Sequence, residues 1–324
     1  MRIRKKLAAA GVAVLLIGSI LGQTVRASAF DNSGYIEGRV SELQEPFYHS
    51  RKPVEYSYVY FGSYPQSEVT GEALTPAVTS AVCDEYGDVR VGNVKYRMVE
   101  RDGCRRYFRY EPIRWRVIRT EKYEKEAYLL ADSVLDYQCY QAESRKEDWK
   151  ESELKYCDIF MWLNSRKEGT KGFTDTAFSL QEQRDIKDYN LYVLDNGENK
   201  CITESAVVPN FYNNEYRKIY KSGECKDIQA SDYAKVQSGE SADSGVKWWC
   251  GRLYNNNGTI YVPYVDETGI LQEEGAPADA QDIGVCPMII VSTADDAVWK
   301  SEREVQLEQG NIVYDEAKTA AVHA

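Results

Sequence analysis

Short apolar runs separated by polar turn residues occupy most of the chain from residue 56 onward. In DVRVGNVKYRMV, residues 88–99, apolar and polar positions alternate on both sides of Gly92-Asn93, which predicts a β-hairpin. Other runs are rich in β-branched and aromatic residues and are bounded by turn residues, so each predicts a strand. These runs are YSYVYFGSYPQ (56–66), PIRWRVIR (112–119), EAYLLADSVL (126–135), VKWWCGRLY (246–254), GTIYVPYV (258–265) and GVCPMIIV (284–291).

Helical spacing is confined to a few segments. Apolar residues recur at helical intervals in ESELKYCDIFMWLNSR (151–166), and TDTAFSLQEQRDIKDY (174–189) offers Thr174 or Asp175 as an N-cap. SDYAKV (231–236) predicts a short helix, and residues 296–309 have helical composition with Gly310 as a cap. The expected class is α+β: short antiparallel strands, two main helices and long irregular loops.

The first 29 residues have the pattern of a secretory signal peptide. MRIRKK is basic, LAAAGVAVLLIGSILG is apolar but short for a membrane span, and Ala27-Ser28-Ala29 resembles a cleavage site. An uncleaved N-terminal anchor is the alternative. We expect a secreted or surface protein without a membrane span after cleavage. Its expected parts are a lead-in segment (30–55), one large domain (56–292) and a helical, partly frayed tail (293–324).

The net charge of the chain narrows the class of partner. The chain has a formal net charge of −11, and removing the basic signal peptide makes it more negative, so nucleic acid is an improbable partner.

Eight cysteines in an exported chain predict disulfides, with buried thiols as the alternative. Cys83 and Cys104 bracket the predicted hairpin and are one expected pair. No CxxC is present, and two histidines argue against a zinc cluster.

Several motifs follow one another in a recognisable order: FGSYPQ, EPIRWRV, LLADSVLDYQCY, a helix ending in WLN, SDYAK, WW and GVCP. This series resembles a family of exported bacterial domains of unknown function, related to the C-type-lectin-like fold of formylglycine-generating enzymes. The resemblance covers about residues 56–292 and implies a C-type-lectin-like domain, which the cysteines of this chain are expected to staple through disulfides. Because a fold does not fix a function, it implies no activity.

The chain departs from this family at two strands. The family usually has Trp-Trp-Leu-Arg-Ser where this chain has Trp-Trp followed by Cys250, and Gly-Val-Arg-Pro where this chain has Cys286. In a C-type-lectin-like core the two strands would be neighbours, so the resemblance implies a Cys250–Cys286 bridge. Such a bridge would contribute about 3–4 kcal/mol in the chain-entropy model.

No catalytic or metal-binding constellation stands out in the sequence. There is no G-x-S-x-G motif, and no histidine is placed for a Ser–His–Asp triad. A calcium site in VDETG (265–269) is outweighed by a β-turn, so we expect no cofactor and no metal. A glycosidase-like pair could form among several carboxylates, although solvated surface is the simpler explanation. The candidates are Asp132, Asp136, Asp175, Glu182, Asp266 and Asp282.

The stretch KWWCGRLYNNNGTIYVPYV (247–265) is the strongest candidate for a ligand surface. Neighbouring side chains on a strand face opposite ways, so one of Trp248 and Trp249 is expected in the core and the other exposed or under a loop. Nearby tyrosines would add rigid amphipathic surface. The predicted ligand-binding residues are Trp249, Tyr254, Asn256, Tyr261 and Tyr264.

Three hypotheses about function follow. The first is a secreted or surface-bound, non-catalytic binding or adhesion module that recognises a glycan or protein ligand. The second is an extracellular enzyme on a formylglycine-generating-enzyme-like scaffold, which needs a reactive cysteine pair or clustered carboxylates. The third is a structural envelope component that docks a partner through residues 296–309 as a helix.

Overall fold

The computed structural model describes residues 56–143, 156–167, 169–195, 198–209, 225–238, 246–251, 253–294, 305–308 and 311–314. In this part of the chain, antiparallel sheet predominates and the helices are short, which confirms the predicted α+β class. This agreement is at the level of class only, so the C-type-lectin-like fold stays a prediction.

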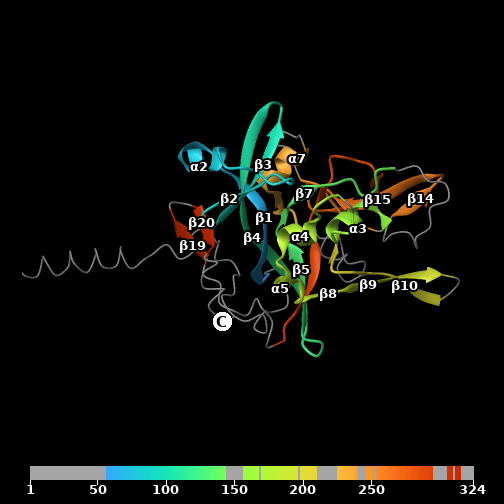
Figure 1. The fold of residues 1–324 in the computed structure, drawn as a ribbon. Helices are drawn as coiled ribbons and strands as arrows, with labels where there is room; N and C mark the ends of the chain where they lie inside the picture. Colours follow the sequence, from blue (N-terminus) through green and yellow to red (C-terminus); the bar gives the residue numbers. More distant parts are fainter. Residues whose placement is uncertain are drawn as a thin grey trace, which may run out of the picture.

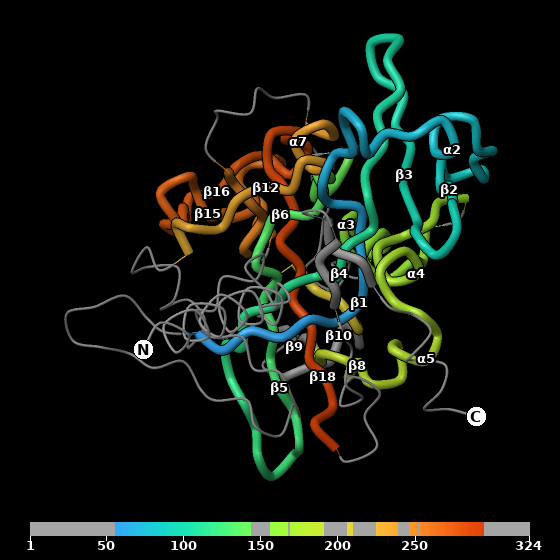
Figure 2. Tube along the Cα trace, turned by 90° about the vertical axis from the view of Figure 1, so that its left-hand side faces the viewer, coloured from blue at the N-terminus to red at the C-terminus, as the bar shows by residue number. Residues whose placement is uncertain are grey.

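The larger sheet is built around β4, an 18-residue strand. Its strand order is β11-β18-β5-β4-β3-β2, with β1 added to β4 and β8 to β18. The tips of the β3–β4 and β4–β5 hairpins lie at opposite ends of this sheet (Figure 1; Figure 2). The bounds are β1 Tyr58–Glu68, β2 Asp88–Val91, β3 Val94–Arg101, β4 Cys104–Glu121, β5 Glu126–Ala131, β8 Ile186–Lys187, β11 Val207–Val208 and β18 Met288–Ser292.

A second sheet has the order β14-β15-β13-β17-β7, with β16 paired to β15. Three small two-stranded pairs complete the described strands: β6 with β12, β9 with β10, and β19 with β20. The bounds are β6 Ser133–Val134, β7 Asp136–Tyr137, β9 Tyr189–Asp195, β10 Glu198–Ser205, β12 Gln229–Ala230, β13 Trp248–Trp249, β14 Tyr254–Asn256, β15 Thr259–Val265, β16 Leu271–Pro277, β17 Gly284–Val285, β19 Val305–Glu308 and β20 Asn311–Tyr314.

Five short α-helices and one 3-10 turn lie in the described residues. The helix α7 packs against both β1 and β7, which belong to different sheets. None of the described helices is long and apolar enough to cross a membrane. The bounds are η2 Gly71–Ala73, α2 Pro76–Thr79, α3 Asp158–Leu163, α4 Phe173–Ala177, α5 Leu180–Gln183 and α7 Asp232–Ser238.

Local turn chemistry explains the hairpins that were predicted. Gly92 has a φ of +59° between β2 and β3, and Asn257 and Gly258 have φ values of +53° and +83° between β14 and β15. Two consecutive positive φ angles, as at Asn257-Gly258, are typical of the type I′ turn, and a glycine with positive φ at the first turn position, as at Gly92, is typical of type II′; both match the twist of the flanking strands. The predicted hairpin over residues 88–99 is therefore confirmed, and Asn257-Gly258 is a hairpin turn.

The prediction of two main helices is wrong for the described residues. The first is reduced to α3, six residues long, while residues 151–155 lie outside the described part. The second is split, because Phe178 has an extended backbone (φ −126°, ψ 135°) that ends α4. Thr174 is no N-cap: it is inside α4 and donates its hydroxyl hydrogen to the Leu163 carbonyl at 2.6 Å. A capping box of Ser179 and Glu182 then starts α5.

The helical prediction for the C-terminal tail is also wrong where the structure describes it. Residues 305–308 and 311–314 form the antiparallel β19–β20 hairpin instead. In the sequence VQLE, apolar and polar residues alternate, and this period of two suits a strand better than the helical composition of the wider segment suggested. A helix over 296–309 therefore no longer supports the structural-envelope hypothesis.

The residues that the structure describes do not include the predicted signal peptide, the lead-in segment or the side chain of Cys201.

The described cysteines form no disulfide in the structure, so disulfide stapling is not confirmed. Cys83 is partly exposed and Cys104 is exposed, whereas Cys225, Cys250 and Cys286 are all buried.

The core of the molecule is continuous and contains the large buried side chains Trp115, Trp248, Trp249, Phe61 and Phe108.

Candidate functional site

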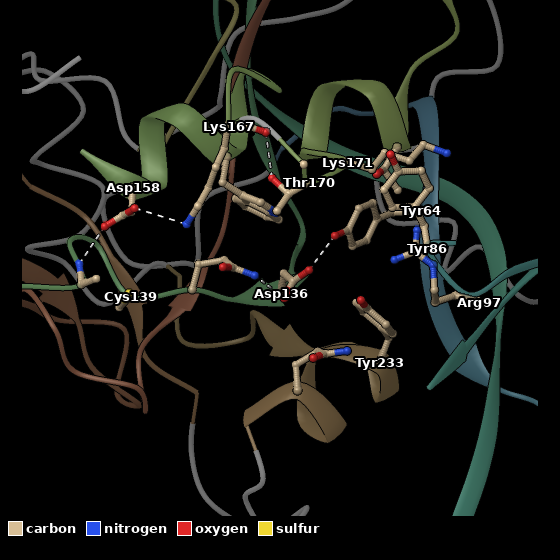
Figure 3. A pocket seen from close by; sticks show the side chains of 16 residues that line it. Tyr64, Tyr86, Arg97, Asp136, Cys139, Asp158, Lys167, Thr170, Lys171 and Tyr233 are labelled. Atoms are coloured by element: carbon tan, nitrogen blue, oxygen red, sulfur yellow. Dashed lines mark hydrogen bonds and ion pairs between the residues drawn. The ribbon is translucent and has the colours of Figure 1, made fainter. Parts of the chain in front are cut away.

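A cavity of about 350 Å³ lies where the two sheets meet α3 and α7 (Figure 3). This volume is at the lower end of the range for small-molecule sites. Its walls are mostly polar and contain carboxylates, phenols, amides, an indole and three cationic side chains. The residues that line it include Tyr64, Tyr86, Arg97, Asp136, Gln138, Asp158, Trp162, Lys167, Lys171 and Tyr233.

Tyr64 reaches the cavity because β1 is irregular just before it. The pairing register of β1 with β4 shifts between Tyr60 and Ser63, which interrupts the alternation of faces. Gly62, within this shift, has a φ of +68°, and a Cβ there would lie 2.5 Å from the Phe178 ring. Only glycine combines this backbone angle with so close an approach. The motif FGSYPQ thus turns the strand and places Tyr64 against Phe173, with ring centroids 5.1 Å apart.

Asp136 is the central acceptor of the cavity. It is buried, and its Oδ2 accepts a hydrogen bond from the Tyr64 hydroxyl at 2.6 Å, while Oδ1 accepts one from the Tyr137 backbone N–H at 2.8 Å. Burial raises the pKa of Asp136 to about 6, and the bond from Tyr64 limits that rise. The site therefore holds a carboxyl group that is ionised at neutral pH and takes up a proton in mild acid.

Two buried phenols surround this carboxylate. The Tyr233 ring, from α7, meets the Tyr64 ring edge-on at 5.8 Å, and both hydroxyl groups are turned toward Asp136 (Figure 3). Burial, followed by the negative charge of Asp136, raises the pKa of both tyrosines well above the ordinary value. Both phenols therefore stay protonated at physiological pH and serve as hydrogen-bond donors.

Behind one wall of the cavity, three cations cluster around one carboxylate, and two of them, Arg97 and Lys171, line the cavity. Asp88 is contacted by Lys95 at 2.9 Å, Arg97 at 2.5 Å and Lys171 at 3.2 Å. It also accepts a hydrogen bond from the Tyr110 hydroxyl at 2.6 Å. Burial opposes ionisation of Asp88, but the Arg97 guanidinium outweighs it and holds the pKa of that carboxyl well below its usual range. The wall thus carries more positive than negative charge.

The opposite wall comes from α3 and the segment that follows it. Lys167 contacts Asp158 at 3.3 Å, and Gln138 donates from Nε2 to Asp136 Oδ1 at 3.4 Å. Trp162 adds an indole that packs on Phe173 with ring centroids 5.8 Å apart. The cavity therefore combines aromatic surface with hydrogen-bonding groups of both kinds, donors and acceptors.

The predicted ligand platform on the tryptophan pair is wrong, because both indoles are buried. Trp248 is 2% exposed and Trp249 is 0% exposed, so this part of the sheet is covered on both faces. Trp249 donates its indole N–H to the Gln138 carbonyl at 2.9 Å. Tyr264, directly opposite Trp249 on β15, is partly buried against the core.

The other predicted ligand-binding residues lie on the β14–β15 hairpin, away from the cavity lining. Tyr254 and Tyr261 face each other across the strands and stack with ring centroids 5.8 Å apart. Asn256 is exposed beside the turn. The structure thus brings Tyr254, Tyr261 and Asn256 together as a second surface, without a described cavity between them.

Of the six carboxylates considered for chemistry, Asp136 alone lines the cavity. Asp132 pairs with Arg114 and Arg116 in the larger sheet. The other four have structural or surface positions: Asp175 is exposed, Glu182 caps α5, Asp266 orders a turn and Asp282 pairs with Lys247.

The sequence contained a signal for the cavity residues that was missed. Tyr64 belongs to FGSYPQ, Asp136 to LLADSVLDYQCY, Trp162 to the WLN motif and Tyr233 to SDYAK. These motifs supported the family resemblance but were treated as markers of fold. Because a residue from each of these four motifs lines the same cavity, the motifs also define the chemistry of that cavity.

Comparisons with known proteins do not add to this description. No family model, no curated protein and no solved structure matches the chain. Within the described residues, no group of three or more His, Cys, Asp or Glu side chains is placed to hold a metal ion.

Proposed function

We propose that this protein is a secreted or surface-bound binding module that holds one or two sugar units of a glycan in the Asp136 cavity. The observation that carries the proposal is the buried Asp136 carboxylate, ringed by phenol and amide groups in a cavity with aromatic walls. A carboxylate accepts hydrogen bonds from vicinal sugar hydroxyls, and aromatic rings cover the apolar faces of sugar rings.

The scaffold and compartment are part of this proposal. The ordered motifs support a C-type-lectin-like domain over about residues 56–292, and the first 29 residues support export. The negative net charge is compatible with a glycan partner and disfavours a nucleic acid, whose phosphates it repels. The binding site that we favour differs from the predicted hairpin surface, because the cavity offers enclosed polar groups and the hairpin does not.

A second candidate is an enzyme in which Asp136 acts as a general acid or base. The observation in its favour is the pKa of about 6, within the range of carboxyl groups that transfer protons in catalysis. Cleavage of glycan probes by the wild type, lost in Asp136→Asn, would establish this candidate. Binding without cleavage supports the module.

The test of the proposal is an oligosaccharide array probed with the protein and three variants. Asp136→Asn alters the cavity, Tyr254→Ala with Asn256→Ala alters the hairpin surface, and Asp175→Asn is the matched control at an exposed site. Loss of a charged acceptor weakens binding by about tenfold or more. We expect that loss in Asp136→Asn only.

Two results would overturn the cavity proposal. One is an array on which the wild type binds no saccharide. The other is binding that survives Asp136→Asn but is lost in the hairpin variant, which would transfer the function to Tyr254 and Asn256. Circular dichroism of each variant verifies that a loss of binding is not a loss of folding.

A further inference from the structure

The cationic wall of the cavity is an exception to the charge of the whole protein. The chain carries a formal net charge of −11, yet Arg97, Lys167 and Lys171 all line one small cavity. The described lining residues include two carboxylates, Asp136 and Asp158. Because the protein is acidic as a whole, this local cationic surplus is not a consequence of its composition.

The cations at the cavity differ in how far protein partners already occupy them. Lys167, on the opposite wall, pairs with Asp158 at 3.3 Å. Arg97 donates from Nε to Asp88 and from Nη2 to the Tyr110 hydroxyl at 2.8 Å, and it is held rigidly between them. Lys95 lies over the Tyr110 ring, with Nζ 3.8 Å from the ring centroid. Both side chains are thus held by protein partners, Arg97 at the surface of the cavity and Lys95 behind it.

Lys171 is the cation best placed to meet a ligand. Its ammonium group has three N–H donors and contacts the shared Asp88 at 3.2 Å, with its side chain 24% exposed. Asp88 already receives Lys95, Arg97 and the Tyr110 hydroxyl, so it neutralises Lys171 incompletely. Figure 3 shows Lys171 beside Tyr86 on the same side of the cavity as Arg97.

From this juxtaposition we infer that the cavity selects a sugar bearing an oxyanion, whose charged group binds Lys171 while its hydroxyls bind Asp136. The inference rests on the proposed function and names its ligand class. Carboxylate, phosphate and sulfate groups share the required chemistry: each accepts charge-assisted hydrogen bonds from an ammonium group. A neutral sugar would leave the surplus charge of the wall unmatched.

The test compares three soluble probes by calorimetry: glucose, glucuronate and glucose 6-phosphate. We expect the wild type to bind at least one of the two anionic probes about tenfold more tightly than glucose. Lys171→Gln should remove most of this preference, and Lys171→Arg should retain it. Lys247→Gln is the matched control, because Lys247 pairs with Asp282 outside the cavity.

The outcomes separate the inference from the proposed function. Equal binding of all three probes, with loss in Asp136→Asn, overturns the anionic preference and keeps the glycan site. A preference that persists in Lys171→Gln also overturns the inference. No binding of any probe, or binding insensitive to Asp136→Asn, overturns both. Carboxylate and phosphate ligands are distinguished by which anionic probe binds more tightly.

Discussion

At the scale of single residues, the cavity depends on a balance between burial and hydrogen bonding at Asp136. Burial disfavours the ionised carboxylate, while the Tyr64 hydroxyl and the Tyr137 N–H favour it. The outcome is a group whose charge changes in mild acid. Asp88, which is also buried, behaves in the opposite way because three cations surround it. In mild acid these two buried carboxylates therefore differ in charge, since Asp136 is protonated while Asp88 stays ionised.

The raised pKa of Asp136 predicts a particular dependence of stability on pH. The folded protein binds this proton up to pH about 6, whereas the unfolded chain releases it near the ordinary value of 3.8. The stabilising effect of protonation is therefore complete below pH 3.8 and is lost as the pH rises through about 6. This difference corresponds to about 3 kcal/mol of unfolding free energy.

Asp136→Asn should lack this effect, since the amide does not titrate. Between pH 3 and pH 8 the unfolding free energy of the variant should improve by about 3 kcal/mol relative to the wild type. Urea denaturation at constant ionic strength measures it, with Asp175→Asn as the control. Parallel pH profiles for the wild type and Asp136→Asn would contradict the assignment.

At the scale of elements, hairpins were predictable because their information is local. Gly92-Asn93 and Asn257-Gly258 specify their turns within a few residues. The segment GVCPMIIV was predicted as one strand, but it forms β17 and β18 in different sheets. Pro287 separates them, because it lacks the N–H that a continuous ladder needs. Which strand each half would join depends on distant pairing that no local pattern encodes.

The cavity was not predictable for a similar reason. Tyr64, Asp136 and Tyr233 are separated by tens of residues and lie on β1, β7 and α7. Tyr64 and Tyr233 looked like ordinary strand and helix residues, and nothing local singled out Asp136 among the six candidate carboxylates. The tryptophan pair was misjudged because the prediction assumed a sheet with one covered face, whereas β13 is covered on both. Non-local packing decides both cases.

The pairing of β13 and β17 bears on the predicted Cys250–Cys286 bridge. Trp248 is opposite Gly284 in a parallel register, so Cys250 and Cys286 each lie two residues further along. Neighbouring strands are about 4.8 Å apart, within the Cα separation of about 4.4–6.8 Å that disulfides accept. Burial is the main cause that raises the pKa of the Cys286 thiol well above its usual value, and the charges of Cys225 and Cys250 add to the rise. Cys225 and Cys250 are thus both near Cys286.

We predict that oxidative refolding with oxidised glutathione joins Cys250 to Cys286. Each new bridge consumes one glutathione disulfide, which accepts the two electrons and two protons of the thiols. Mass spectrometry of a non-reduced digest should detect the linked peptides, and Cys286→Ser should lower stability by about 3 kcal/mol. Cys104→Ser, at an exposed site, is the control. A Cys225–Cys286 link, or alkylation of both thiols after denaturation, would contradict the prediction.

At the scale of the whole molecule, the cavity joins parts that do not otherwise share a sheet. Tyr64 and Arg97 belong to the larger sheet, Asp136 belongs to the second, and α7 packs on both. A ligand that contacts Asp136 and Lys171 therefore links the second sheet to the larger one, because Lys171 pairs with Asp88 of β2. Binding should stabilise both, because opening either one would release the ligand.

Hydrogen exchange with and without an anionic sugar probe measures this coupling. At a free probe concentration of ten times the Kd, amides whose exchange requires opening of the cavity should exchange about tenfold more slowly. We expect this protection in β3, β7 and α7 together, and no change at the β14–β15 turn, which lies outside the cavity. Protection limited to the second sheet would mean that the ligand contacts Asp136 without engaging the cationic wall. Protection centred on β14 and β15 would mean that the hairpin surface, and not the cavity, holds the sugar.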